Sequence, residues 1–267
     1  MRQPKFGDRD STALRHPLRD KPLRNPGQSL DERIDSVVND DIGASILIAL
    51  FVWFLAGWEL FTELRGLPRM PGTFAVMAVV VTLLAAWRIR VLREKLRLLK
   101  LGRDGERFVG QFLEGLRRSG AHVFHDVVAE GFNIDHVIVA PQGVFAIETK
   151  TWMKRRGAHV LTTQDGHLLR NGQRLSPNPI DQACGSSDWI SDRLSASTGR
   201  QIKAWPVVLF PGWFVEQDAA TKQRAWVLNE KGLEAFLRNA KRRLPDDEVS
   251  MIATHLGLLI RASEKNH

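Results

Sequence analysis

Two apolar runs in the first third of the chain limit how this protein can fold. The first is IGASILIALFVWFLAGWELF, residues 42–61, and the second is TFAVMAVVVTLLAAWRI, which begins at residue 73. A helix needs about 20 apolar residues to cross a bilayer. The short connection between the runs is rich in Pro and Gly, which favour a turn. We therefore predict a transmembrane helical hairpin within residues 42–93, with spans at about 42–62 and 73–90.

The charges that flank these runs predict their orientation. The second run continues into RIRVLREKLRLLKLGR, which is dense in Arg and Lys, whereas the connecting loop carries only Arg65 and Arg69. Basic residues accumulate on the cytoplasmic side of a membrane. We therefore expect a multi-pass protein of the cytoplasmic (inner) membrane with both termini in the cytoplasm and the lipid bilayer as a partner. The alternative is a buried helical pair in a soluble protein.

The segments on either side of the hairpin are polar and basic. Residues 1–41 contain many Arg, Asp and Pro residues and no long apolar run, which predicts a disordered cytoplasmic tail. Residues 94–101 are expected to form a basic linker helix. The single cysteine, Cys184, excludes an internal disulfide and a cysteine-based zinc site. The formal net charge of +8 favours an anionic partner, but charge alone does not distinguish nucleic acid from lipid.

A charged β-hairpin is predicted for NIDHVIVAPQGVFAIETK, residues 133–150. Val, Ile and Phe dominate both halves, and the APQG between them is typical of a turn. If the loop holds an even number of residues, Val139 pairs with Val144 and Asp135 lies opposite Glu148. One face is then expected to carry Asn133, Asp135, Val137, Val139, Val144, Ala146, Glu148 and Lys150, and the other face Ile134, Ile138, Phe145 and Ile147.

The charges on this hairpin have two explanations. Carboxylates on adjacent strands repel each other, and a divalent metal relieves that repulsion. Oxygen ligands favour Mg²⁺ or Mn²⁺, and Lys150 beside such a site can position a metal-bound water or stabilise a developing charge, as in phosphodiester hydrolysis. The other explanation is structural, with Glu148 and Lys150 forming an ion pair on a strand where Asp135 begins the edge. Spacing alone leaves both open.

A helix is predicted over GERFVGQFLEGLRR, which begins at Gly105. Its apolar residues recur at helical spacing, and Glu106 lies near the same inward side. A carboxylate that faces inward needs a cation or a hydrogen-bond donor. Alternatively, Glu106 is a first-turn acid that complements the helix dipole, which is a common placement.

Two segments of the chain resemble the nuclease-related domain (NERD) of the PD-(D/E)xK nuclease superfamily. They are GRDGERFVGQFLEGL and, after it, NIDHVIVAPQGVFAIETKTW. The resemblance covers about residues 102–214 and departs at Thr151, where asparagine is more usual, and at Ile134, where proline is more usual. It implies an α/β fold with a restriction-endonuclease-like mixed sheet flanked by helices. Residues 215–267 are expected to add a strand and helices that complete or extend this domain.

The resemblance also implies an activity and a set of site residues. The activity is that of a Mg²⁺-dependent (or Mn²⁺-dependent) nuclease acting on DNA or RNA, with nucleic acid, DNA in the first place, as the partner. The alternative is a catalytically inactive nucleic-acid-binding or scaffold module at the membrane. The expected catalytic residues are Asp135, Glu148, Lys150, Glu106 and Gln182, and the expected metal ligands are Asp135, Glu148 and the carbonyl of Thr149.

Two further assignments are weaker in the sequence. Gln182 lies on a helix predicted to start at Pro179, and it resembles a glutamine that related nucleases use at the edge of the site. An exposed helix glutamine explains it equally well. Lys154, Arg155 and Arg156 form a basic triplet after the hairpin. Beside a metal site they are expected to hold a phosphate backbone, whereas elsewhere such a triplet is an ordinary solvated surface.

Overall fold

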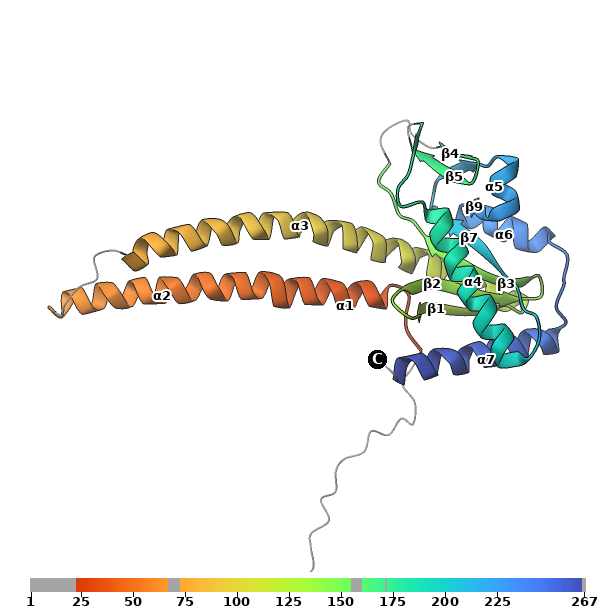
Figure 1. Cartoon of the computed structure of the whole chain (residues 1–267), viewed down its shortest axis with the longest axis horizontal. Coiled ribbons are helices and arrows are strands. Elements are labelled where there is room, and N and C mark those ends of the chain that lie inside the picture. The colour runs from red at the N-terminus through yellow and green to blue at the C-terminus, as the bar shows by residue number, and fades with distance from the viewer. Residues whose placement is uncertain (1–22, 67–72, 155–159, 171, 266–267) are drawn as a thin grey trace, which may run out of the picture.

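The computed structural model describes residues 23–66, 73–154, 160–170 and 172–265, and it consists of a long helical pair joined to an α/β body (Figure 1). The first arm of the pair contains α1 (Gln28–Ser36), a π-helical turn η1 (Val37–Gly43) and α2 (Ala44–Leu64). The second arm is α3 (Thr73–Glu114), a single helix of 42 residues. Because α3 is continuous, the predicted second span, the basic linker and the first helix of the body form one rod.

Residues 28–41 are helical, where the sequence predicts a disordered tail; residues 1–22 lie outside the described part. The difference arises from a tertiary contact, the packing of α1 on α3. Asp31 of α1 forms ion pairs with Arg103 and Arg107 of α3 at 3.4 and 2.5 Å. A short polar helix has little stability alone and depends on such contacts.

The apolar side chains of the helical pair face outward. Two helical stretches, Gln28–Leu64 and Thr73–Ser119, are long and apolar enough to cross a membrane, and only 6% of the most apolar window of each is buried. The core helices of a soluble protein would be mostly covered by the rest of the chain. Polar contacts between the arms include a hydrogen bond of 2.9 Å from Trp53 Nε1 to Thr82 Oγ1 and an ion pair of 2.8 Å between Arg88 and Asp41.

The body is built on a five-stranded mixed sheet in the order β1-β2-β3-β7-β9. The strands β1, β2 and β3 are antiparallel neighbours, and β7 and β9 continue the sheet in parallel. Their bounds are β1 His122–Val128, β2 Asn133–Ala140, β3 Gly143–Thr149, β7 Ala204–Leu209 and β9 Trp226–Leu228. A smaller sheet has the order β6-β5-β4-β8 and contains β4 Val160–Gln164, β5 His167–Arg170, β6 Gln173–Arg174 and β8 Phe214–Glu216.

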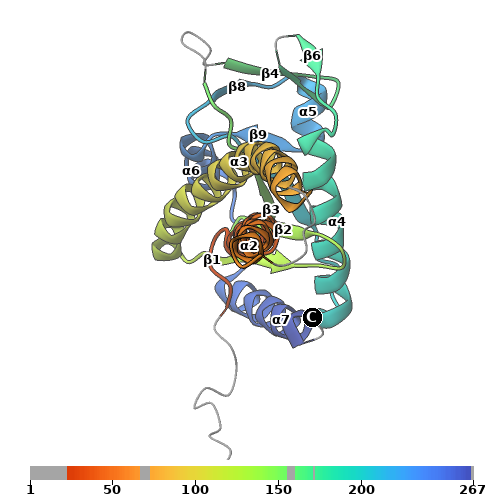
Figure 2. The same ribbon diagram turned by 90° about the vertical axis from the view of Figure 1, so that its left-hand side faces the viewer.

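Helices cover both faces of the five-stranded sheet, as α6 and α7 show on its opposite sides in Figure 2. On one face α4 (Pro179–Thr198) and α7 (Asp246–Lys265) enclose a core, and on the other the C-terminal part of α3 packs with α6 (Glu230–Asn239). A 3₁₀ turn η2 (Gly115–Ser119) leads from α3 to β1, and α5 (Ala219–Arg224) precedes β9. The architecture is therefore mixed α/β with two sheets flanked by helices.

The predicted register of the hairpin is confirmed. Val139 pairs with Val144, and the pairing of His136 with Ile147 places Asp135 opposite Glu148. The predicted face of Ile134 is wrong. Ile134 packs in the core that contains Val137 and Val139, and not in the core that contains Ile138. The cause lies in β1. Asp126 has a left-handed φ of 50°, which interrupts the alternation of side chains at this end of the strand pair.

Candidate active site

One cavity of about 1140 Å³ lies where the hairpin, α3, α4 and α1 meet. It brings together six residues that the sequence analysis selects: Glu106, Asp135, Glu148, Thr149, Lys150 and Gln182. They come from three separate parts of the chain. Glu106 lies on α3, the next four lie on β2, β3 and the residue after β3, and Gln182 lies exposed in the first turns of α4.

Gly105 explains how α3 comes close enough to bring Glu106 to the strands. A Cβ atom at position 105 would lie only 1.6 Å from Thr151 Oγ1 and 2.7 Å from Thr151 Cβ. The absence of a side chain therefore lets the chain after β3 approach the helix axis. Val109 and Leu113, one and two turns further on, are fully buried against the sheet and fix the rotation of α3. With this rotation Glu106 faces inward and is only 9% exposed.

Asp135 and Glu148 face each other across the hairpin with different partners. The backbone N–H of Thr149 donates to Asp135 Oδ2 at 2.6 Å. Lys150 Nζ lies 2.6 Å from Glu148 Oε1, and the N–H of Lys150 donates to the carbonyl of Leu209 on β7 at 2.8 Å. Both ends of this charged group are therefore fixed by the backbone of the sheet. The ion pair that the structural explanation predicts is present.

The surroundings of Asp135 and Glu106 disfavour the ionisation of these two carboxyl groups. Burial, and then the charges of Glu148 and Glu106, raise the pKa of Asp135 well above its ordinary value, although the Thr149 N–H and the Lys150 ammonium act in the opposite direction. Burial, and then the charges of Asp126 and Glu148, raise the pKa of Glu106 to about 8. A cluster of this kind binds either protons or a cation.

The donor atoms suit a hard divalent cation that keeps part of its water shell. No three side chains of His, Cys, Asp or Glu converge into a complete cage within the part of the chain that the structure describes. Asp135 and Glu148 supply two carboxylates, which is the protein contribution that Mg²⁺ commonly uses, with water and substrate oxygens completing its shell. The hydroxyls of Thr149 and Thr151, which also line the cavity, are buried without a hydrogen-bond partner, so the site has polar groups left for water or a ligand.

Of the predicted basic triplet, the structure describes Lys154 alone. Lys154 donates to the carbonyl of Gly212, and its Nζ lies 5.4 Å from the centroid of the Trp213 ring. It does not line the cavity. Arg155 and Arg156 lie outside the described residues, so their role stays a prediction.

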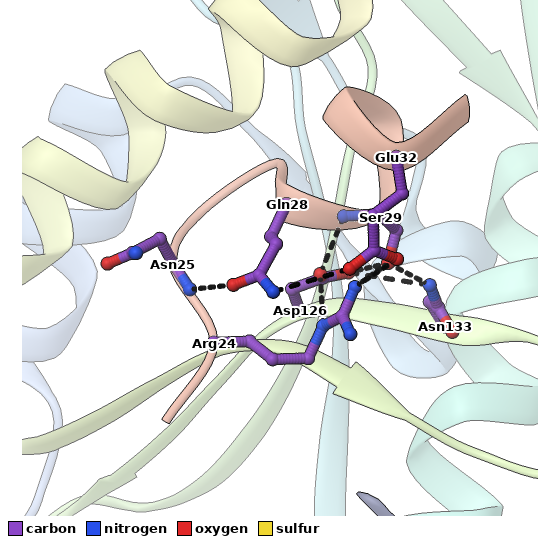
Figure 3. A network of polar contacts seen from close by, with 7 residues as sticks. All are labelled: Arg24, Asn25, Gln28, Ser29, Glu32, Asp126 and Asn133. Carbon is purple, nitrogen blue, oxygen red and sulfur yellow. Dashed lines mark hydrogen bonds and ion pairs between the residues drawn. The ribbon is translucent and has the colours of Figure 1, made fainter. Parts of the chain in front are cut away.

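A second polar cluster at the edge of the cavity was not predicted. Asp126 is buried, and it accepts hydrogen bonds from Arg24 and Ser29, while Asn133 donates to the same carboxylate, as Figure 3 shows. Asp126, Ser29 and Asn133 line the cavity. The only signal in the sequence is a lone acid at an inward strand position. Nothing local shows that its partners lie about a hundred residues earlier.

Comparison with known proteins supports one family. Residues 101–211 match the family model of the nuclease-related domain (NERD). Searches of curated proteins and of solved structures each gave no match. The matched segment begins on α3 shortly before Glu106, includes Asp135, Glu148 and Lys150, and ends just after β7. Residues 101–211 of this protein therefore match the nuclease-related domain, a family placed in the PD-(D/E)xK nuclease superfamily.

Proposed function

We propose that this protein is a membrane-tethered, divalent-metal-dependent nuclease that hydrolyses phosphodiester bonds in DNA or RNA. The observation that carries the proposal is the convergence of Glu106, Asp135, Glu148 and Lys150 on one open cavity. Burial and neighbouring carboxylates raise the pKa of Asp135 and of Glu106, and such a cluster is costly to keep in a purely structural role. In a hydrolytic site, a bound cation offsets the repulsion between these carboxylates.

Asp135 and Glu148 are the proposed ligands of Mg²⁺ or Mn²⁺, and the carbonyl of Thr149 is a third. A bound divalent cation supplies Lewis acidity and an activated water. The Thr149 N–H holds Asp135 in place, which orients one carboxylate before any ligand arrives. Gln182, exposed at the rim on α4, is proposed to contact the substrate or the attacking water.

Lys150 and Glu106 have the remaining roles. Lys150 is held at Glu148 with its side chain 27% exposed, so its ammonium can reach a water or a phosphate oxygen in the cavity. There it positions the attacking water or stabilises negative charge in the transition state. Glu106 is proposed to act beside the two ligands, by orienting water or by helping to hold a second cation.

The membrane tether is proposed to be the pair formed by α2 and the first part of α3. Their apolar surfaces are uncovered, and basic residues follow the second span; both observations support our proposal of a multi-pass inner-membrane protein with both termini in the cytoplasm. At roughly 1.5 Å per residue, the part of α3 between Trp87 and Glu106 is about 28 Å long. The rod thus holds the site away from the bilayer, where a nucleic acid can reach it.

The domain organisation is part of the same proposal. The restriction-endonuclease-like core comprises residues 102–214, and residues 215–267 complete it. β9 extends the five-stranded sheet, while α6 and α7 cover its two faces. The second candidate function is a catalytically inactive nucleic-acid-binding or scaffold module. The close Glu148–Lys150 ion pair is the observation that favours it.

A cleavage assay with the full-length protein in nanodiscs separates the two functions. Labelled single- and double-stranded DNA and RNA are incubated with Mg²⁺, Mn²⁺, Ca²⁺ or EDTA. We expect degradation of at least one substrate with Mg²⁺ or Mn²⁺ and none with EDTA. Asp135→Asn should lower the rate by roughly 10²-fold or more, the scale of one positioned catalytic group. Glu234→Gln, an exposed change on α6, is the matched control. Binding without cleavage by the parental protein would favour the inactive module.

A further inference from the structure

One wall of the cavity comes from outside the nuclease-related domain. Ser29, Leu30 and Arg33 line it together with Glu106 and Asp135. These three residues lie in what we call the N-terminal segment, residues 23–36, which precedes the first apolar run. The family match begins only at residue 101. The N-terminal segment therefore lies outside the residues that match the family.

Asp126 fixes the N-terminal segment to the edge of the sheet (Figure 3). Its Oδ2 accepts hydrogen bonds from Arg24 Nε at 2.7 Å and from the N–H of Ser29 at 2.8 Å, and its Oδ1 accepts one from the Ser29 hydroxyl at 2.5 Å. Asn133 donates to Asp126 Oδ1 at 3.4 Å and also to the Ser29 hydroxyl. The side chain of Asp126 is only 2% exposed. A buried carboxylate with charged and backbone donors holds its partners in one geometry.

Close packing on α3 fixes the same segment a second time. A Cβ atom at Gly110 would lie 2.5 Å from Pro26 Cγ, and one at Gly102 would lie 3.3 Å from Leu30 Cδ1. Both glycines therefore mark places where the segment lies directly against the helix. Together with the ion pairs of Asp31, these contacts determine which side of α1 faces the cavity. Arg33 is on that side.

Among the described residues that line the cavity, one basic side chain has no acidic partner. The acidic residues that line it are Glu106, Asp126, Asp135, Glu148, Asp181 and Asp192. The basic residues that line it, within the described part of the chain, are Arg33 and Lys150. Lys150 is paired with Glu148. Arg33 is exposed, and its guanidinium has no ion pair among the described residues.

We infer that Arg33 binds a backbone phosphate of the nucleic-acid substrate and that α1 forms one side of the substrate groove. This inference rests on the proposed nuclease function. A polyanion that enters an acidic cavity needs a cationic contact besides any bound metal. The planar guanidinium donates two parallel hydrogen bonds to a phosphate, which fixes the strand as well as attracting it. The substrate strand then lies between α1 and the hairpin.

The test compares Arg33→Gln with Arg238→Gln, an exposed arginine on α6 that does not line the cavity. Full-length proteins in zwitterionic nanodiscs are titrated with fluorescein-labelled DNA, as single strand and as duplex, in Ca²⁺ over a range of salt concentrations. Cleavage of the same DNA is measured in Mg²⁺. We expect Arg33→Gln to raise Kd and KM roughly tenfold and to reduce the salt slope by about 1, with kcat nearly unchanged. Arg33→Lys should recover part of the binding, because it restores the charge.

Each result has a separate meaning. If the parental protein binds and cleaves DNA while Arg33→Gln behaves like Arg238→Gln, the inference about Arg33 is wrong and the proposed function stands. If the parental protein neither binds nor cleaves DNA, and RNA substituted in the same assays gives the same result, the function and the inference fail together. Thermal melts of both variants in the same nanodiscs show whether each is folded, since neither side chain has a hydrogen bond or ion pair among the described residues.

Discussion

Gly105→Ala is the substitution that tests most directly how the fold builds the site. The new methyl group would lie 1.6 Å from Thr151 Oγ1, 2.7 Å from Thr151 Cβ and 3.0 Å from Thr151 Cγ2. Rotation of the Thr151 side chain can remove the first overlap but not the second, because the Cβ atom is fixed to the backbone. The helix and the chain after β3 must therefore move apart by about 1 Å to restore ordinary packing distances.

The expected effects on stability and on activity differ in size. Overpacking of this kind costs about 1–3 kcal/mol, whereas alanine in place of glycine inside a helix gains about 1 kcal/mol. The net change in the free energy of unfolding is therefore at most about 2 kcal/mol. A displacement of about 1 Å between Glu106 and the hairpin carboxylates, however, is expected to reduce cleavage by roughly 10²-fold.

The assay measures both quantities on the same full-length protein, with thermal melts for stability and single-turnover cleavage for activity. Gly115→Ala is the matched control, because a Cβ atom there has no neighbour within 4 Å. Adding Thr151→Gly to Gly105→Ala removes every overlapping atom and should recover activity. Parental activity in Gly105→Ala, or no recovery in the double variant, would refute the idea that this close approach sets the position of Glu106.

Three further predictions concern the charged cluster itself. Asp135→Asn and Glu148→Gln should each leave the melting temperature in EDTA unchanged or higher, because each removes carboxylate repulsion. A large fall in the melting temperature would mean that the cluster is structural. The pKa of Glu106 is raised from its ordinary 4.5 to about 8, so the metal-free folded state binds a proton more tightly than the unfolded state. As the pH rises from 4.5 to 8, the free energy of unfolding should therefore fall, by at most about 5 kcal/mol. Glu106→Gln should flatten that fall in melts at several pH values, and an unchanged slope would contradict the assignment. Lys150→Arg should bind DNA in Ca²⁺ as the parent does but cleave it roughly 10²-fold more slowly, because a guanidinium cannot replace the compact ammonium; normal cleavage would make Lys150 structural.

Local features of the sequence were enough to predict the hairpin. A turn between two runs of Val, Ile and Phe sets the pairing of Val139 with Val144, and this pairing places Asp135 opposite Glu148. The helical spacing after Gly105 likewise predicts that Glu106 faces inward, as observed. These predictions succeed because each depends on residues close together in the chain, where backbone periodicity determines the direction of a side chain.

The predictions that failed depend on contacts between distant segments. The segment that contains Ser29 reaches Asp126 across 97 residues, and no periodicity indicates which polar residues of a tail will dock. The face of Ile134 follows the left-handed backbone at Asp126, a non-glycine residue for which that conformation is uncommon.

These distant contacts also show that the family segment is not a complete structural unit in this protein. Asp126 lies inside residues 101–211, yet its charged partner Arg24 lies outside them. A carboxylate buried without its partner is strongly destabilising. Both arms of the helical pair contribute to the lining of the cavity, with Glu106 on α3 and Arg33 on α1. Because both arms also carry the apolar stretches, the proposed membrane tether and the proposed site share the same pair of helices. The proposed tether is thus part of the proposed site's architecture as well as a means of holding the protein at a membrane.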